Sequence, residues 1–215
     1  MKLTVDRIVS AGMDTFAEVG YEGLSMRQVA DRLDVHAGSL YYHVRNKNAL
    51  LALMADRVAQ ESYDAGDLAL AALPRNATWR DRIEAQALAL RTGIRKHRGG
   101  AALLAGSPYL LSTGALALME RLLTTLRKAG VPAEHRVVAA DTLLSHITGF
   151  VLQEQTDSSA PAVTPEQIAA LSERFPLTME RAIGGTAYDE DEMFVRSVRL
   201  LCAAIATVIS GEENP

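Results

Sequence analysis

The sequence has little of several features that would by themselves suggest a function. Its single cysteine, Cys202, cannot form a disulfide within the chain, so we expect a buried thiol in a reducing compartment. A net charge of −4 gives no basic excess of the kind that marks many nucleic-acid-binding proteins. The apolar stretch at residues 200–209 is far shorter than the roughly 20 residues that a membrane span requires. With no visible signal peptide, these absences predict a cytoplasmic protein without a membrane segment.

Aromatic residues are also scarce, at 5% of the chain, whereas apolar residues make up 48% and are supplied largely by Ala and Leu. This composition favours helices over strands, and no alternating pattern typical of strands is present. The spacing of apolar residues, together with capping residues and glycine stops, predicts an all-α protein. The expected helices lie at residues 4–19, 25–33, 37–43, 46–73, 78–98, a short segment before 106, 110–128, 133–154, 164–183 with a potential break at Pro176, and 189–209.

Residues 26–45 have the features of a helix-turn-helix. Ala30 is small enough to let two helices approach closely. Asp34 tolerates the positive φ of a tight turn better than most residues other than glycine. Leu40 is placed to bury its side chain against the first helix. A helix, a turn of three or four residues and a second helix are therefore predicted.

The outward side of the second helix carries polar groups that suit DNA. Ser39, Tyr42 and His43 lie on that side, and the basic residues Arg27 and Lys47 flank the unit. Hydroxyl, imidazole and basic groups bind phosphates and base edges. The same residues would also suit an ordinary solvated face, because many folds contain such helix pairs.

Two segments, FAEVGYEGLSMR at residues 16–27 and LYYHVRNKNALL at residues 40–51, resemble the DNA-binding domain of the TetR family of repressors. The resemblance implies a three-helix N-terminal helix-turn-helix domain at residues 1–48 and a larger helical ligand-binding and dimerisation domain at residues 49–215. It assigns base reading in the major groove to Arg27 and phosphate binding to Lys47. The expected DNA-binding residues are Arg27, His36, Ala37, Gly38, Ser39, Tyr41, Tyr42, His43 and Lys47.

The chain departs from the pattern of that family at the turn and at the start of the second helix. Asp34 stands where the family often has glycine, and Ala37 and Gly38 leave the start of the second helix almost without side chains. A methyl group can contact a thymine methyl but cannot read a hydrogen-bonding pattern. We therefore expect sequence specificity to depend on Arg27, His36 and DNA shape.

Short segments farther along the chain resemble the tetracycline-repressor subclass of the same family, namely WRD at 79–81, HRGGA at 97–101, GV at 130–131 and GFVLQEQ at 149–155. Independently, the helices at 133–154 and 189–209 are apolar nearly all round, so both sides of each must be covered. In the resembled family these two helices from each subunit form a four-helix dimer interface, and we expect a homodimer. The alternative is that both are core helices of a monomer.

The resemblance also locates an effector pocket, but its chemistry differs. Leu104 stands where the subclass has a metal-binding histidine, and Gln153 stands where a carboxylate meets the water shell of the metal. Magnesium prefers oxygen ligands held by carboxylate charge, so we expect no metal, no cofactor and no magnesium–tetracycline complex. We expect instead a mainly apolar or aromatic organic effector. The candidate ligand-binding residues are Gln86, Leu90, Leu104, Ser107, Tyr109, Met119, Leu122, His146, Phe150 and Gln153. Alternatively, these residues only fill a core.

No catalytic constellation is visible. None of the five histidines pairs at i,i+4, and there is no GxSxG, P-loop or GxGxxG motif, so we predict no enzymatic activity. The predicted function is a ligand-responsive transcriptional repressor that binds a palindromic operator as a homodimer and is released by a small organic effector. An activator or constitutive DNA-binding protein of the same fold, and a helical small-molecule carrier, are the alternatives.

Overall fold

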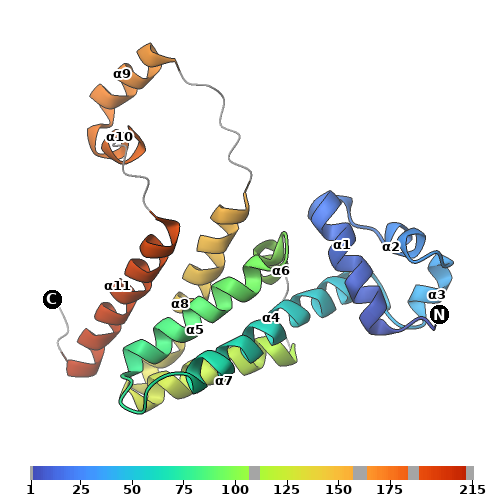
Figure 1. Ribbon diagram of the computed structural model, residues 1–215, viewed down its shortest axis with the longest axis horizontal. Coiled ribbons are helices and arrows are strands. Elements are labelled where there is room, and N and C mark those ends of the chain that lie inside the picture. Colours follow the sequence, from blue (N-terminus) through green and yellow to red (C-terminus); the bar gives the residue numbers. More distant parts are fainter. Residues whose placement is uncertain (1, 107–111, 157–163, 184–188, 212–215) are drawn as a thin grey trace.

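The computed structural model describes residues 2–106, 112–156, 164–183 and 189–211, and this part of the chain is helical without strands (Figure 1). The all-α fold expected from the composition is confirmed. In chain order the helices are α1 (Val5–Gly23), α2 (Met26–Arg32), α3 (Ala37–Tyr41), α4 (Lys47–Ala71), α5 (Trp79–Arg95), α6 (Gly100–Gly106), α7 (Thr113–Lys128), α8 (Ala133–Gln155), α9 (Pro165–Arg174), α10 (Pro176–Ile183) and α11 (Glu190–Ser210).

Local side chains begin the helices near the predicted positions. The Asn46 side chain accepts the N–H of Ala49 at 2.9 Å and so caps α4. Thr78 and Asp81 form a reciprocal capping box at the start of α5. Each cap satisfies a backbone N–H that has no partner inside its helix.

Several helix boundaries differ from the prediction, including the end of α1 at Gly23 and the end of α5 at Arg95. The helix expected at 37–43 ends at Tyr41, and the helix expected from 110 begins at Thr113 behind the cap Ser112. The potential break at Pro176, by contrast, is present, and the segment 164–183 is divided into α9 and α10 at Phe175, which has φ −132° and ψ 58°. The division occurs there because the residue before a proline, here Pro176, disfavours the helical conformation.

Helices α1 to α3 form the helix-turn-helix unit at one end of the molecule (Figure 1). Asp34 has φ 53°, the positive value expected for the turn. Ala30 and Leu40 are fully buried where the two helices meet. The two residues that helped to predict the motif therefore pack the two helices together, and the opposite side of α3 faces outward.

Helix α4 joins this unit to the larger domain, where it packs against α5, α6 and α7. At its crossing with α5 the two helices approach so closely that a side chain added to Gly93 would overlap Ser62. Such close packing makes the two helices move together. Helix α4 thus connects the larger domain to the DNA-binding unit as one continuous helix.

A buried ion cluster fastens α5, α8 and α11 together. The Arg91 side chain, which is 4% exposed, donates to both carboxylate oxygens of Glu154 and lies 2.7 Å from Asp191. Its guanidinium also lies over the ring of Phe194, 4.8 Å from the centroid. Although burial opposes the charge, the hydrogen bonds to Glu154 and Asp191 raise the pKa of Arg91. The cluster orients α11 against α8.

By length and mean hydropathy alone, helix α11 could cross a membrane. Sequence reasoning did not indicate this, because it considered only the shorter apolar stretch at residues 200–209. Core helices of globular proteins have the same composition, and one side of α11 packs against α5 and α8. Helices α9 and α10 pack against each other and stand away from the rest of the molecule (Figure 1).

Candidate DNA-binding surface and effector cavity

The outward face of α2 and α3 carries most of the predicted DNA-binding side chains. Arg27 is exposed in the first turn of α2, and His36, Tyr41 and His43 are exposed along or beside α3. Tyr42 follows α3 and is 92% exposed, so its ring and hydroxyl are accessible. Leu40 is buried on the other side of α3, so that these exposed side chains lie on the outward side of the unit.

The start of α3 is open, as the small residues there suggest. His36 is the N-cap residue but makes no capping hydrogen bond with its side chain. A Cβ placed on Gly38 would meet no atom within 4 Å. Ala37 and Ser39 are half-buried. A DNA backbone or base edge can therefore approach the first turn of α3 closely.

Lys47 is held in place at the first turn of α4. Its ammonium donates to the carbonyl of Tyr21 at 2.7 Å and lies 5.0 Å from the centroid of the Tyr21 ring. An ammonium has three donors, so the contact with Tyr21 leaves hydrogens for a phosphate. Sequence reasoning overlooked Tyr21 as the residue that positions Lys47. The motif at residues 16–27 includes Tyr21, but nothing in it indicates this contact.

An apolar cavity of about 140 Å³ lies within the larger domain, between α4, α5, α6, α7 and α8. Three of the predicted pocket residues, Leu90, Leu104 and Met119, contribute to its wall. The other lining residues are Ala59, Ala115, Leu116, Leu118, Leu144 and Thr148. Sequence reasoning missed Leu144 and Thr148, although their spacing of four on α8 could have placed both on one face.

Gln86 and Leu122 lie beside this cavity, around a space of only about 10 Å³. The Gln86 amide donates to Thr125 Oγ1 at 3.0 Å, and its oxygen accepts from Arg121 Nε at 3.3 Å. Because these contacts occupy both ends of the buried amide, Gln86 joins α5 to α7. A ligand that reached it would have to exchange these hydrogen bonds.

His146 and Phe150 occupy a different place, in an aromatic cluster with Phe194 between α8 and α11. His146 Nε2 lies 2.6 Å from Ser197 Oγ, and burial lowers the pKa of the imidazole. Gln153 is exposed on α8. The remaining candidates, Ser107 and Tyr109, lie outside the described residues.

The described residues of the cavity wall are mainly apolar. Leu104 presents only hydrocarbon, and within the described residues no group of three or more histidine, cysteine, aspartate or glutamate side chains could hold a metal ion. Apolar cavities with a few polar groups are the usual sites for organic molecules, and among the described lining residues Thr148 contributes a hydroxyl.

A second apolar surface lies on α8 and α11, facing away from the core. Val137 and Val138 on α8 and Leu200 on α11 are all more than half exposed. Between the two helices runs a groove of about 190 Å³ lined by Val131, His135, Val138, Ala139, Thr142, Leu143, Leu201, Ala204, Ile205 and Val208. These residues form an apolar surface on the outward sides of α8 and α11.

A helix-turn-helix joined through one long helix to a domain with an apolar cavity defines a DNA-binding regulator of the ligand-responsive class. Two family models match the chain. The model for bacterial regulatory proteins of the tetR family covers residues 8–54, and the model for the tetracyclin repressor-like C-terminal domain covers residues 71–209. The chain therefore belongs to the TetR family.

Relatives and solved structures agree with this assignment. An HTH-type transcriptional regulator of Saccharopolyspora erythraea is 32% identical over 98% of this chain and 87% of its own length. The class A tetracycline repressor protein from transposon 1721 of Escherichia coli is 32% identical over 100% of this chain and 97% of its length. Among solved structures, ActR of Streptomyces coelicolor in complex with (S)-DNPA has a TM-score of 0.74 and 26% identity over 98% of this chain and 99% of its own. The expectation of a ligand-responsive transcriptional repressor of this family is confirmed.

Proposed function

We propose that the protein represses transcription as a cytoplasmic homodimer, and that a mainly apolar or aromatic molecule in the cavity releases it from DNA without a metal. The observation that carries the proposal is that α4 takes part in both sites. Lys47 begins this helix beside α3, and Ala59 lines the cavity about 18 Å farther along at 1.5 Å per residue. We place the functional boundary between residues 48 and 49, just inside α4.

The exposed residues on α2, α3 and the start of α4 would contact the operator. Arg27 would read a base edge, while Lys47 would bind a phosphate from its position beside Tyr21. His36, Ala37, Gly38, Ser39, Tyr41, Tyr42 and His43 would complete the contact surface. In a two-fold dimer the two units would bind half-sites about one helical turn apart, roughly 34–36 Å.

The apolar surface on α8 and α11 supports dimerisation through these two helices. A two-fold axis would place each α8 and α11 against the same pair in the partner, which covers the exposed valines and leucines of both copies. The membrane-like hydropathy of α11 has the same explanation, because a helix between its own core and a partner is covered on both sides.

The composition of the cavity supports an effector that binds without metal. The relative from transposon 1721 is named a tetracycline repressor, which makes a tetracycline the natural alternative. Leu104 and the neighbouring aliphatic side chains offer hydrocarbon contacts only, and hard cations such as magnesium need oxygen ligands. Ligands of drug size need more than 140 Å³, so binding would push the cavity walls apart, α4 included.

Linkage turns this displacement into regulation. A ligand that binds better to the conformation with poor DNA affinity weakens operator binding by the same factor. The test is a reporter placed behind the DNA upstream of the protein's own gene. A repressor lowers expression and its effector restores it, whereas an activator raises expression. A carrier with no role in transcription would leave expression unchanged and would fail to bind the fragment in vitro.

A further inference from the structure

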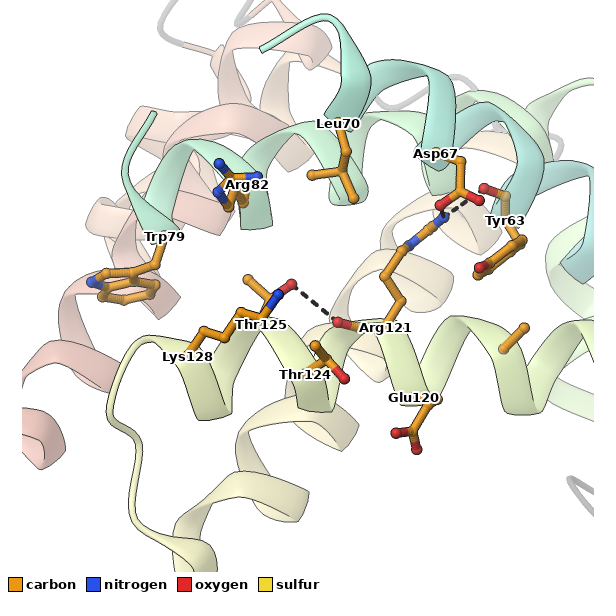
Figure 2. Close-up of a pocket in the computed structure, with 11 residues that line it drawn as sticks. Tyr63, Asp67, Leu70, Trp79, Arg82, Glu120, Arg121, Thr124, Thr125 and Lys128 are labelled. Atoms are coloured by element: carbon orange, nitrogen blue, oxygen red, sulfur yellow. Dashed lines mark hydrogen bonds and ion pairs between the residues drawn. The ribbon is translucent and has the colours of Figure 1, made fainter. Parts of the chain in front are cut away.

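A larger cleft, of about 800 Å³, lies between the second half of α4, the start of α5 and α7 (Figure 2). It has no lining residue in common with the apolar cavity. Its principal side chains are Tyr63, Asp67, Trp79, Arg82, Arg121 and Lys128. The volume falls within the range of small-molecule sites, about 300–1,000 Å³.

Arg121 forms the inner wall of the cleft, with its side chain only 10% exposed. Its guanidinium donates to the Tyr63 carbonyl at 2.6 Å and to the Asp67 carboxylate at 3.0 Å, both on α4. It also lies 4.4 Å from the centroid of the Tyr63 ring. The same group crosses α4 at Gly66, where any side chain would overlap the guanidinium. A glycine inside a helix is destabilising, so its presence here is explained by the space that Arg121 occupies.

The charges around Arg121 favour an anion. Among the residues that the structure describes, neither Arg82 nor Lys128 forms an ion pair with a carboxylate. Glu120 also lines the cleft, but its side chain extends from the other side of α7, away from Arg121 (Figure 2). The acid that does face Arg121 is Asp67, and its side chain is 54% exposed. Arg121 therefore holds a carboxylate that another carboxylate could replace.

The remaining walls are suited to an aromatic ring. Trp79 lies at one end of the cleft and Tyr63 at the other, with Leu70 between them (Figure 2). Aromatic side chains bind flat rings by stacking or by edge contacts, and a guanidinium binds a carboxylate through parallel hydrogen bonds. We propose that this cleft is a second binding site, which takes a small aromatic carboxylic acid whose carboxylate replaces Asp67 on Arg121.

Trp79 is the only tryptophan of the chain, so it reports on the cleft directly. The probe is 1-naphthaleneacetate, compared with its uncharged amide, 1-naphthaleneacetamide. In ¹H–¹⁵N spectra of the full-length protein, the single indole N–H resonance should shift saturably with the acid. The amide should bind at least about tenfold more weakly, because hydrogen bonds to charged groups are stronger than those to neutral ones. Equal affinity for the acid and the amide would overturn the proposal.

Neighbouring residues on α7 provide a matched pair of variants. Lys128 lines the cleft, whereas Arg127 is exposed outside it. Lys128→Gln should weaken binding of 1-naphthaleneacetate by about 2- to 5-fold, as expected for the loss of one partly exposed ion pair. Arg127→Gln should leave the affinity for this acid unchanged. If the two variants behave alike, long-range charge rather than the cleft governs binding and the proposal is wrong.

Asp67→Asn gives a test in the opposite direction. This substitution removes the carboxylate that competes for Arg121, so 1-naphthaleneacetate should bind about 2- to 5-fold more tightly. Partial unfolding of the variant would weaken binding and cannot produce this result. Leu104→Phe, which narrows the separate apolar cavity, should have no effect on the probe. Loss of binding in Leu104→Phe, or no gain in Asp67→Asn, would contradict the assignment of the acid to this cleft, whereas the effector proposal above would stand in either case.

Discussion

The outward face of α11 provides a sharp test of the dimer. Leu200 is 72% exposed on the protomer, so Leu200→Glu should change the stability of an isolated protomer by no more than about 0.5 kcal/mol. In the proposed dimer each copy would bury one unpaired carboxylate, at about 1–3 kcal/mol apiece. Two symmetric copies give about 2–6 kcal/mol, which weakens association by roughly 30-fold to 10⁴-fold. Sedimentation velocity at micromolar concentration should show a folded monomer.

The matched control is Leu68→Glu. Leu68 is 75% exposed on α4, away from α8 and α11, and carries the same change of charge. This variant should remain dimeric, with a circular dichroism spectrum close to that of Leu200→Glu. Leu201 and Ile205 are less suitable positions, because both pack against the protomer's own core and a charge there would also unfold it. A dimer of undiminished affinity in Leu200→Glu would refute the assignment of this face.

Three further predictions concern single residues. Arg27→Ala should cost operator binding about 1–3 kcal/mol and relax preference at one base pair, whereas Lys47→Ala should weaken all sequences alike and flatten the salt dependence; identical behaviour across operator variants in fluorescence anisotropy would contradict these roles. Burial lowers the pKa of His146, so the unfolded chain binds the proton more readily and stability should fall as the pH drops below about 6.5; urea titrations should show a smaller fall in His146→Asn. Burial raises the pKa of Cys202 to about 11, so iodoacetamide at pH 8 should modify this thiol only after unfolding, and rapid modification of the native protein would contradict its burial.

The features of the fold that could be predicted are those encoded by neighbouring residues. The cap at Asn46 and the box at Thr78 and Asp81 each join residues three positions apart, so the sequence displays them directly. Asp34 was predicted at the turn for its tolerance of positive φ, which it adopts. The division at Pro176 is likewise a local effect of the ring.

The site was harder to predict because its contacts join distant segments. The spacing of Gln86 along α5 gives no sign that Thr125 and Arg121 of α7 occupy its amide. His146 was expected to complete the lining of the pocket, but the packing of α11 places Phe194 and Ser197 against it. Helical periodicity identifies the buried face of each helix, but it does not say which helix covers that face.

The central claim is that an organic molecule releases the operator without a metal, and one titration tests it. The protein is bound to a fluorescent fragment of the DNA upstream of its own gene, and apolar and aromatic compounds are added in the presence of a magnesium chelator. The account predicts that at least one such compound lowers the anisotropy to that of free DNA, and that Leu104→Phe, which narrows the apolar cavity, weakens its effect. Release by tetracycline with magnesium, abolished by the chelator and matched by no compound in its absence, would contradict it.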